Sequence, residues 1–145
     1  MSKPIMFYTA GPFKEQAFVR GVAEKLREAG YEVNSRWLES SPDAPEGVSM
    51  DDYLHQQAIR DLEDIFEADA LIYVNTGYKS EGKATELGVA IATLKPIIII
   101  GDRSNNVFLN LNIPAYPTIE EAIAWLQAEE DRHIHVTNRK AGRSL

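Results

Sequence analysis

Four consecutive isoleucines at positions 97–100 constrain the fold of this chain more than any other feature. Only a strand that is buried on both faces tolerates such a run, and strands of this kind occur in parallel sheets covered by helices on both sides. Two further apolar runs of strand length lie at residues 5–10 and 70–74. We therefore expect an α/β protein whose core is a parallel sheet.

Segments in which apolar residues recur at helical spacing separate these runs, as a layered α/β fold requires. Two of them begin with capping signals: Ser49 precedes one, and Thr118 with Glu121 forms a capping box at the start of another. Residues 38–47 form a long irregular loop, and long loops in compact domains often act as lids. The expected helices are residues 15–29, 49–67, 82–94 and 118–126, and residues 31–37 alternate as a further strand.

Length and composition indicate one domain. A chain of 145 residues with 44% apolar and 26% charged residues is an ordinary globular sequence, long enough to bury one core without disulfides or bound metals. We expect residues 1–130 to form this domain. Residues 131–145 are basic and lack an apolar period, so they are interpreted as a frayed carboxyl-terminal tail.

Cysteine content and charge exclude several classes of function. The chain has no cysteine, which excludes thiolate catalysis, cysteine-based zinc sites and a disulfide framework. Its formal net charge of −7 disfavours a nucleic-acid polymer or an anionic membrane as the main partner. No apolar run approaches the roughly 20 residues that cross a bilayer, and the amino terminus lacks a signal-peptide layout. We expect a cytoplasmic protein.

Ligands of open parallel sheets bind beyond the carboxyl ends of the strands. This rule selects residues 8–14, residues 75–86 and the turn after position 100. No phosphate-binding Walker loop occurs, and Gly11 has no second glycine nearby that would complete a dinucleotide-binding fingerprint. The Gly-x-Ser-x-Gly motif is absent, and the three histidines lack metal-ligand spacing, so neither a serine hydrolase nor a metal site is expected.

Glu86 is the most informative residue of these segments. We expect it in the first turn of the helix that follows the third strand, where the helix amino terminus would keep its carboxylate ionised. A carboxylate held in a cleft in this way suits nucleophilic attack on a sugar carbon. The alternative is an exposed glutamate that only favours the helix dipole.

Two further candidates accompany Glu86. Asp61 lies at the edge of the apolar stripe of the preceding helix, and a partly buried carboxyl tends to hold the proton that a general acid needs; the alternative is one more charge on an acidic helix. Tyr8 is expected at the end of the first strand, where its phenol either faces the cleft or only closes the core. Gly11 and Pro12 form a tight turn that lets a ligand approach the backbone.

Four short motifs occur along the chain in a characteristic order. Together they resemble the nucleoside 2-deoxyribosyltransferase family over about residues 5–125. The resemblance implies a single flavodoxin-like, Rossmann-like domain with a parallel sheet of about five strands flanked by helices. It also implies glycosyl transfer between a small-molecule nucleoside and a free nucleobase, without cofactor or metal, in a homo-oligomer. The motifs are Tyr8-Thr9-Ala10-Gly11-Pro12-Phe13, Asp61-Leu62 with Ala68-Asp69, Thr85-Glu86-Leu87-Gly88, and Lys95-Pro96.

The resemblance assigns a role to each candidate. Glu86 attacks the anomeric carbon of a 2′-deoxynucleoside and expels the base, while Tyr8 orients the glutamate and Asp61 assists protonation of the leaving base. A second base then takes the sugar from the glutamyl ester, which is the retaining two-carboxylate scheme applied to an N-glycosidic bond. Asn110 matches the first residue of an Asn-Leu-Met segment that a neighbouring subunit supplies in many members, although the third residue here is Asn112.

One departure from the transferase pattern keeps a second activity open. Six residues before Glu86, transferases commonly carry an aspartate, whereas this chain has Ser80. The related 2′-deoxynucleoside 5′-monophosphate N-hydrolases look similar and have a serine there that binds the phosphate. Lys14 would add positive charge for a phosphate, whereas Glu81 would imitate the missing aspartate and Asn110 favours the transferase. We predict the transferase, with the hydrolase and a non-catalytic nucleotide-sensing domain as alternatives. The expected substrate-binding residues are Gly11, Phe13, Lys14, Ser80, Glu81, Gly82 and Asn110.

Overall fold

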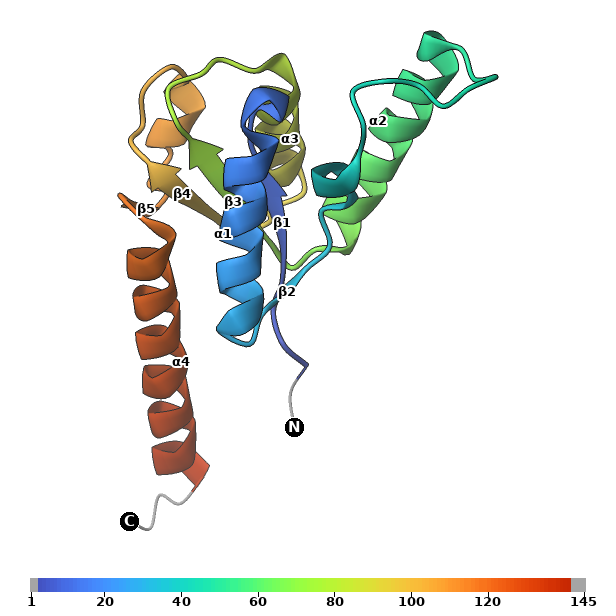
Figure 1. Ribbon diagram of the computed structural model, residues 1–145. Helices are drawn as coiled ribbons and strands as arrows, with labels where there is room; N and C mark the ends of the chain where they lie inside the picture. Colours follow the sequence, from blue (N-terminus) through green and yellow to red (C-terminus); the bar gives the residue numbers. More distant parts are fainter. Residues whose placement is uncertain (1–2, 142–145) are drawn as a thin grey trace.

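Five parallel strands form the centre of the fold, in the order β2-β1-β3-β4-β5 (Figure 1). The computed structural model describes the backbone of residues 3–141 and the side chains of residues 3–132. Because the first strand lies between the second and the third, the sheet has the flavodoxin-like order. The expected α/β class with a parallel sheet is confirmed. The strands are β1 (Met6–Ala10), β2 (Glu32–Val33), β3 (Ala70–Asn75), β4 (Ile97–Gly101) and β5 (Ala115–Tyr116).

α1, α3 and α4 pack against the sheet, and the helices also contact one another in two pairs, α1 with α4 and α2 with α3. The expected caps are present, since the Ser49 hydroxyl accepts from the Asp52 amide at 3.1 Å and the Thr118 hydroxyl accepts from the Glu121 amide at 3.2 Å. No helix of the described part is long and apolar enough to span a bilayer. The helices are α1 (Gln16–Glu28), α2 (Met50–Glu67), α3 (Glu81–Ala92) and α4 (Ile119–Ala141), with short 3-10 turns η1 (Phe13–Glu15), η2 (Arg36–Glu39) and η3 (Val107–Asn110).

The isoleucine run occupies β4, where all four side chains are buried. β3 pairs with β4 on one side and with β1 on the other, so the carboxyl ends of β1 and β3 are neighbours. The chain leaves β1 through Gly11, where a Cβ atom would come within 2.6 Å of the Val19 side chain. A glycine is therefore required for α1 to lie this close to the end of β1.

β2 is shorter than the strand expected at residues 31–37. The amide of Thr9, which a longer β2 would bind with a backbone carbonyl, instead donates to the Ser35 hydroxyl at 2.7 Å. The next residue, Arg36, donates from Nε to the buried carboxylate of Asp64 at 2.9 Å and begins η2. These two side-chain interactions turn the chain out of the sheet.

The last helix is longer than expected. α4 continues through residues 131–141, which the sequence assigned to a tail, because neither glycine nor proline interrupts it there. In Figure 1 this helix extends away from the sheet. The side chains after Arg132, including both carboxyl-terminal histidines, and residues 142–145 lie outside the described residues.

Candidate active site

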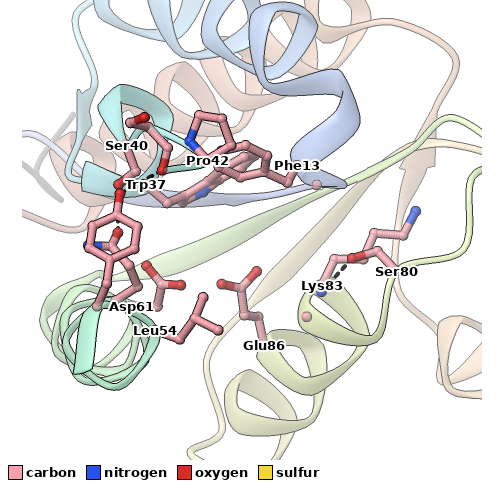
Figure 2. A pocket seen from close by; sticks show the side chains of 14 residues that line it. Phe13, Trp37, Ser40, Pro42, Leu54, Asp61, Ser80, Lys83 and Glu86 are labelled. Carbon is pink, nitrogen blue, oxygen red and sulfur yellow. Dashed lines mark hydrogen bonds between the residues drawn. The ribbon is translucent and has the colours of Figure 1, made fainter. Parts of the chain in front are cut away.

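A cavity of about 320 Å³ opens at the carboxyl end of β1, between α2 and α3 (Figure 2). The segments after β1 and β3 both line it, as the carboxyl-end rule predicts. The loop at residues 38–47 adds Ser40, Ser41 and Pro42 to its wall. The long loop thus borders the cavity that holds the candidate residues.

Glu86 lies in the cavity wall as a half-buried side chain of α3. The helix begins at Glu81, one residue after its cap Ser80, so Glu86 belongs to the second turn and not to the first. Burial raises the pKa of Glu86 to about 8; the nearby charge of Asp61 adds to this effect, and a hydrogen bond from Tyr8 opposes it. The expectation that the helix terminus keeps this carboxylate ionised is therefore wrong, because Glu86 lies beyond the first turn and its burial raises the pKa.

Tyr8 contacts Glu86 directly. The expected position at the end of the first strand is wrong, because β1 continues to Ala10 and Tyr8 lies in its middle, completely buried. Its hydroxyl donates a short hydrogen bond to Oε2 of Glu86. Burial and the neighbouring carboxyl groups raise the pKa of Tyr8 far above the ordinary value for a phenol. The phenol therefore keeps its proton and acts as a fixed donor to the glutamate.

Asp61 faces the same cavity from α2, and Figure 2 shows its carboxyl group next to that of Glu86. Its Oδ1 atom is buried and has no hydrogen-bond partner. Burial raises the pKa of Asp61 to about 6, the charge of Asp64 adds to the rise, and the cations Arg60 and Arg36 oppose it. A carboxyl group with this proton affinity is suited to general acid catalysis near neutral pH.

The predicted binding residues divide into two groups. Three lie outside the cavity: Lys14 is exposed with its ammonium 5.7 Å from the centre of the Tyr78 ring, Glu81 lines a smaller neighbouring cavity, and Asn110 is exposed at the end of η3. Those that line the main cavity are Gly11, Phe13, Ser80 and Gly82.

Six polar or aromatic residues of the wall were not predicted as site residues: Trp37, Ser40, Ser41, Tyr53, Gln57 and Lys83. Trp37 donates its indole N–H to the Thr9 carbonyl at 2.8 Å, which leaves the ring face to the cavity. Lys83 is only 3% exposed, and its ammonium donates to the Asn75 side chain at 3.2 Å. Gln57 lies one helical turn before Asp61. Helical spacing in the sequence could have indicated two of them. Lys83 precedes Glu86 by three residues and Gln57 precedes Asp61 by four, so each lies on the same helix face as a predicted catalytic residue.

No group of three or more His, Asp or Glu side chains within the described residues is arranged to hold a metal ion. The polar groups of the cavity wall are instead the two carboxyl groups and the hydroxyl and amide groups of α2 and its loop, while the Lys83 ammonium is buried against Asn75 and the Tyr73 ring. This arrangement combines a potential nucleophile, a potential acid and an apolar slot.

Comparison with known proteins supports the fold. No protein-family model and no curated protein matches the sequence. Among solved structures, a 2-deoxyribosyltransferase from Bacillus psychrosaccharolyticus is similar over 81% of this chain and 90% of that chain, with a TM-score of 0.64 and 23% identity. A conserved protein from Enterococcus faecalis V583 is similar over 88% of this chain and 99% of that chain, with a TM-score of 0.68 and 17% identity. The chain therefore shares its fold with a 2-deoxyribosyltransferase.

Proposed function

We propose that this chain is a nucleoside 2-deoxyribosyltransferase, which cleaves the N-glycosidic bond of a 2′-deoxynucleoside and transfers the sugar to another nucleobase. The observation that carries the proposal is the pair of carboxyl groups, Glu86 and Asp61, which face one cavity from two helices and differ in proton affinity. The sequence motifs and the fold shared with a 2-deoxyribosyltransferase support the same chemistry.

In the first step, ionised Glu86 attacks C1′ of the sugar. Tyr8 holds Oε2, so Oε1 is the atom that forms the new C–O bond. The C1′–N bond breaks with its electron pair going to the base, and protonated Asp61 transfers its proton to a nitrogen of that base. The products of this step are the neutral free base, a glutamyl ester of deoxyribose and an ionised Asp61.

In the second step, a different nucleobase occupies the place of the first. Asp61, now a carboxylate, accepts the N–H proton of the incoming base while the base nitrogen attacks C1′. The ester bond breaks, and its electrons return to Glu86 as carboxylate. Two inversions at C1′ preserve the configuration of the glycosidic bond.

Base exchange tests the proposal directly. Wild-type protein is incubated with deoxyuridine and free thymine, and the formation of thymidine is followed by liquid chromatography. Glu86→Gln should abolish exchange, while the control Glu24→Gln, an exposed change on α1 outside the cavity, should retain it. Acid quenching followed by peptide mass spectrometry should place a deoxyribosyl group on Glu86. Full exchange by Glu86→Gln, or a sugar attached elsewhere, would refute the assignment.

A 2′-deoxynucleoside 5′-monophosphate N-hydrolase is the second candidate, favoured by a specific feature of the cavity. Ser80 and Lys83 both line it, and the Lys83 ammonium forms its hydrogen bond with a neutral amide and has only the more distant charge of Glu15 nearby, so a phosphate would add a direct counter-charge. Asn110, the residue that favours the transferase, is exposed outside the cavity of its own chain, which agrees with a role in a neighbouring subunit and does not separate the two candidates. In this reaction water resolves the same glutamyl ester.

The substrate separates the candidates. A hydrolase should consume deoxynucleoside 5′-monophosphates, release base and deoxyribose 5-phosphate, and form no exchanged nucleoside. Lys83→Met should then lower kcat/KM for the monophosphate by roughly 10²-fold, the effect of losing a charge-assisted contact of about 2–3 kcal/mol. Binding of nucleotides without turnover would instead favour the sensing domain.

A further inference from the structure

Gln57 lies on the cavity face of α2 together with the acid candidate. Leu54, Gln57 and Asp61 follow one another at positions i, i+3 and i+7, and all three line the cavity. Four residues of helix separate the Gln57 and Asp61 backbones by about 6 Å along the axis. If a nucleobase lies in the cavity with the nitrogen of its glycosidic bond near Asp61, the opposite edge of the base therefore lies near Gln57.

The hydrogen bond between Ser40 and Gln57 fixes the orientation of the amide. The Ser40 hydroxyl oxygen lies 2.6 Å from Oε1 of Gln57. This distance is typical of O–H···O bonds and shorter than the usual range for N–H···O bonds, so the amide oxygen is the atom that contacts the serine. The Nε2 amino group, which carries two N–H donors and no acceptor, remains for the cavity.

The adjoining loop offers a second donor. The Ser41 hydroxyl oxygen accepts from the Asp43 amide at 3.1 Å, which leaves its proton free to donate. Tyr53 donates its own hydroxyl proton to the Ser41 carbonyl at 2.6 Å and so anchors the loop to α2. The wall remote from Glu86 thus presents donors from Gln57 and Ser41, both of which line the cavity.

The remaining walls suit a planar ring. Phe13 and Trp37 form a tilted aromatic pair with ring centres 6.3 Å apart, and in Figure 2 they lie across the cavity from Leu54. Bases stack on aromatic faces whatever their substituents, so this slot gives affinity without discrimination. Discrimination therefore depends on the polar groups at the edge of the ring.

From these contacts we infer that Gln57 selects nucleobases with a carbonyl group on the edge opposite the glycosidic bond, by donating an N–H to that oxygen. The inference rests on the proposed function, because it takes the cavity to hold the base of an N-glycoside. A carbonyl oxygen accepts from Gln57 and Ser41, whereas an exocyclic amino group would place donor against donor and lose these bonds. Hypoxanthine, guanine, uracil and thymine carry the required oxygen, while adenine and cytosine carry an amino group in its place.

The test is the ratio of kcat/KM between matched substrates: deoxyinosine against deoxyadenosine, deoxyuridine against deoxycytidine, and their 5′-monophosphates. Wild-type protein should favour the carbonyl substrate of each pair by roughly 10–100-fold, the effect of one or two unmade hydrogen bonds in a buried site. Gln57→Met, which has no donor, should reduce the ratio to within about 3-fold. Gln57→Glu, which only accepts, should reverse it. The matched control Gln56→Met changes an exposed neighbour and should leave the ratio unchanged.

A second variant keeps the test decisive if Gln57 substitutions unfold the protein. Ser40→Ala retains the Gln57 amide but removes the hydrogen bond that orients it. The ratio of kcat/KM between carbonyl and amino substrates should therefore decrease although the glutamine is still present. A wild-type preference for amino substrates, equal rates on both, or an unchanged ratio in Gln57→Met and Ser40→Ala would overturn the inference while leaving base cleavage intact.

Failure of the proposed function is distinguishable. If no substrate is cleaved, calorimetric titration of free hypoxanthine and of free adenine into the Glu86→Gln variant measures the dissociation constant of each base for the cavity, independently of catalysis. Tighter binding of hypoxanthine that is lost in the Glu86→Gln, Gln57→Met double variant supports the inference although cleavage has failed. Equal binding of the two bases, or binding of neither, overturns both.

Discussion

The pH dependence of kcat/KM follows from the two displaced proton affinities in the cavity. Burial raises the pKa of Glu86 to about 8 and that of Asp61 to about 6. The proposed reaction needs Glu86 ionised and Asp61 protonated, so exactly one proton is shared between them. Because the groups are coupled, this singly protonated form predominates between about pH 6 and pH 8, and kcat/KM should follow a bell with its maximum near about pH 7.

Asp61 is the group that protonates the leaving base, so the loss of this proton sets the size of the effect. Burial and the charge of Asp64 raise the pKa of Asp61 to about 6, which keeps this proton available near neutral pH. Asp61→Asn removes the acid and leaves only the ionisation of Glu86. Its kcat/KM should fall by roughly 10²–10⁴-fold at pH 7, the usual effect of a positioned acid.

The shape of the profile should change with the same substitution. In Asp61→Asn, kcat/KM should rise with pH to a plateau and lose the alkaline decline, because ionisation of Glu86 is then the only requirement. The midpoint should lie below about 8, since the charge of Asp61 contributes to the raised pKa of Glu86. Base release is measured by liquid chromatography at substrate concentrations below KM, from about pH 5 to pH 9.5. Asp51→Asn, an exposed change on the same helix, is the control. A bell with unchanged limbs in Asp61→Asn would refute the reasoning.

Three further predictions follow from the same contacts. Tyr8→Phe removes a hydrogen bond that lowers the pKa of Glu86, so the alkaline limb should move to higher pH and kcat/KM at pH 7 should fall about 10-fold; an unmoved limb contradicts this. Folding raises the pKa of Glu86 from its ordinary 4.5 to about 8, so the contribution of its proton to the free energy of unfolding is lost as pH rises through this range. Glu86→Gln should therefore melt roughly 2–6 °C above wild type at about pH 9 but not at about pH 4.5. Thermal unfolding followed by circular dichroism measures this difference. If Asn110 completes a neighbouring subunit's cavity, Asn110→Ala and Glu86→Gln proteins should each be inactive but recover activity when mixed; mixed oligomers without activity would argue against that role.

The layers of the fold were predictable because hydrophobic pattern and caps are local properties. The isoleucine run alone requires a strand covered on both faces, and Ser49 and Thr118 mark the beginnings of their helices from the residues beside them. The end of β2 was not predictable in this way. It depends on Thr9 and Asp64, side-chain and backbone partners more than 25 residues from the segment they redirect.

The sequence by itself determined the α/β layers, the edge of the sheet where the candidate residues gather, and the three side chains Tyr8, Asp61 and Glu86. Only the tertiary structure decided that both carboxyl groups lose water and hold their protons more tightly than in solution. Tyr8 and Glu86 are 78 residues apart, and the water that they lose is displaced by β1, α2, α3 and the loop together. Proton affinity depends on everything that surrounds a group in space, and a pattern of neighbours along the chain does not contain that information.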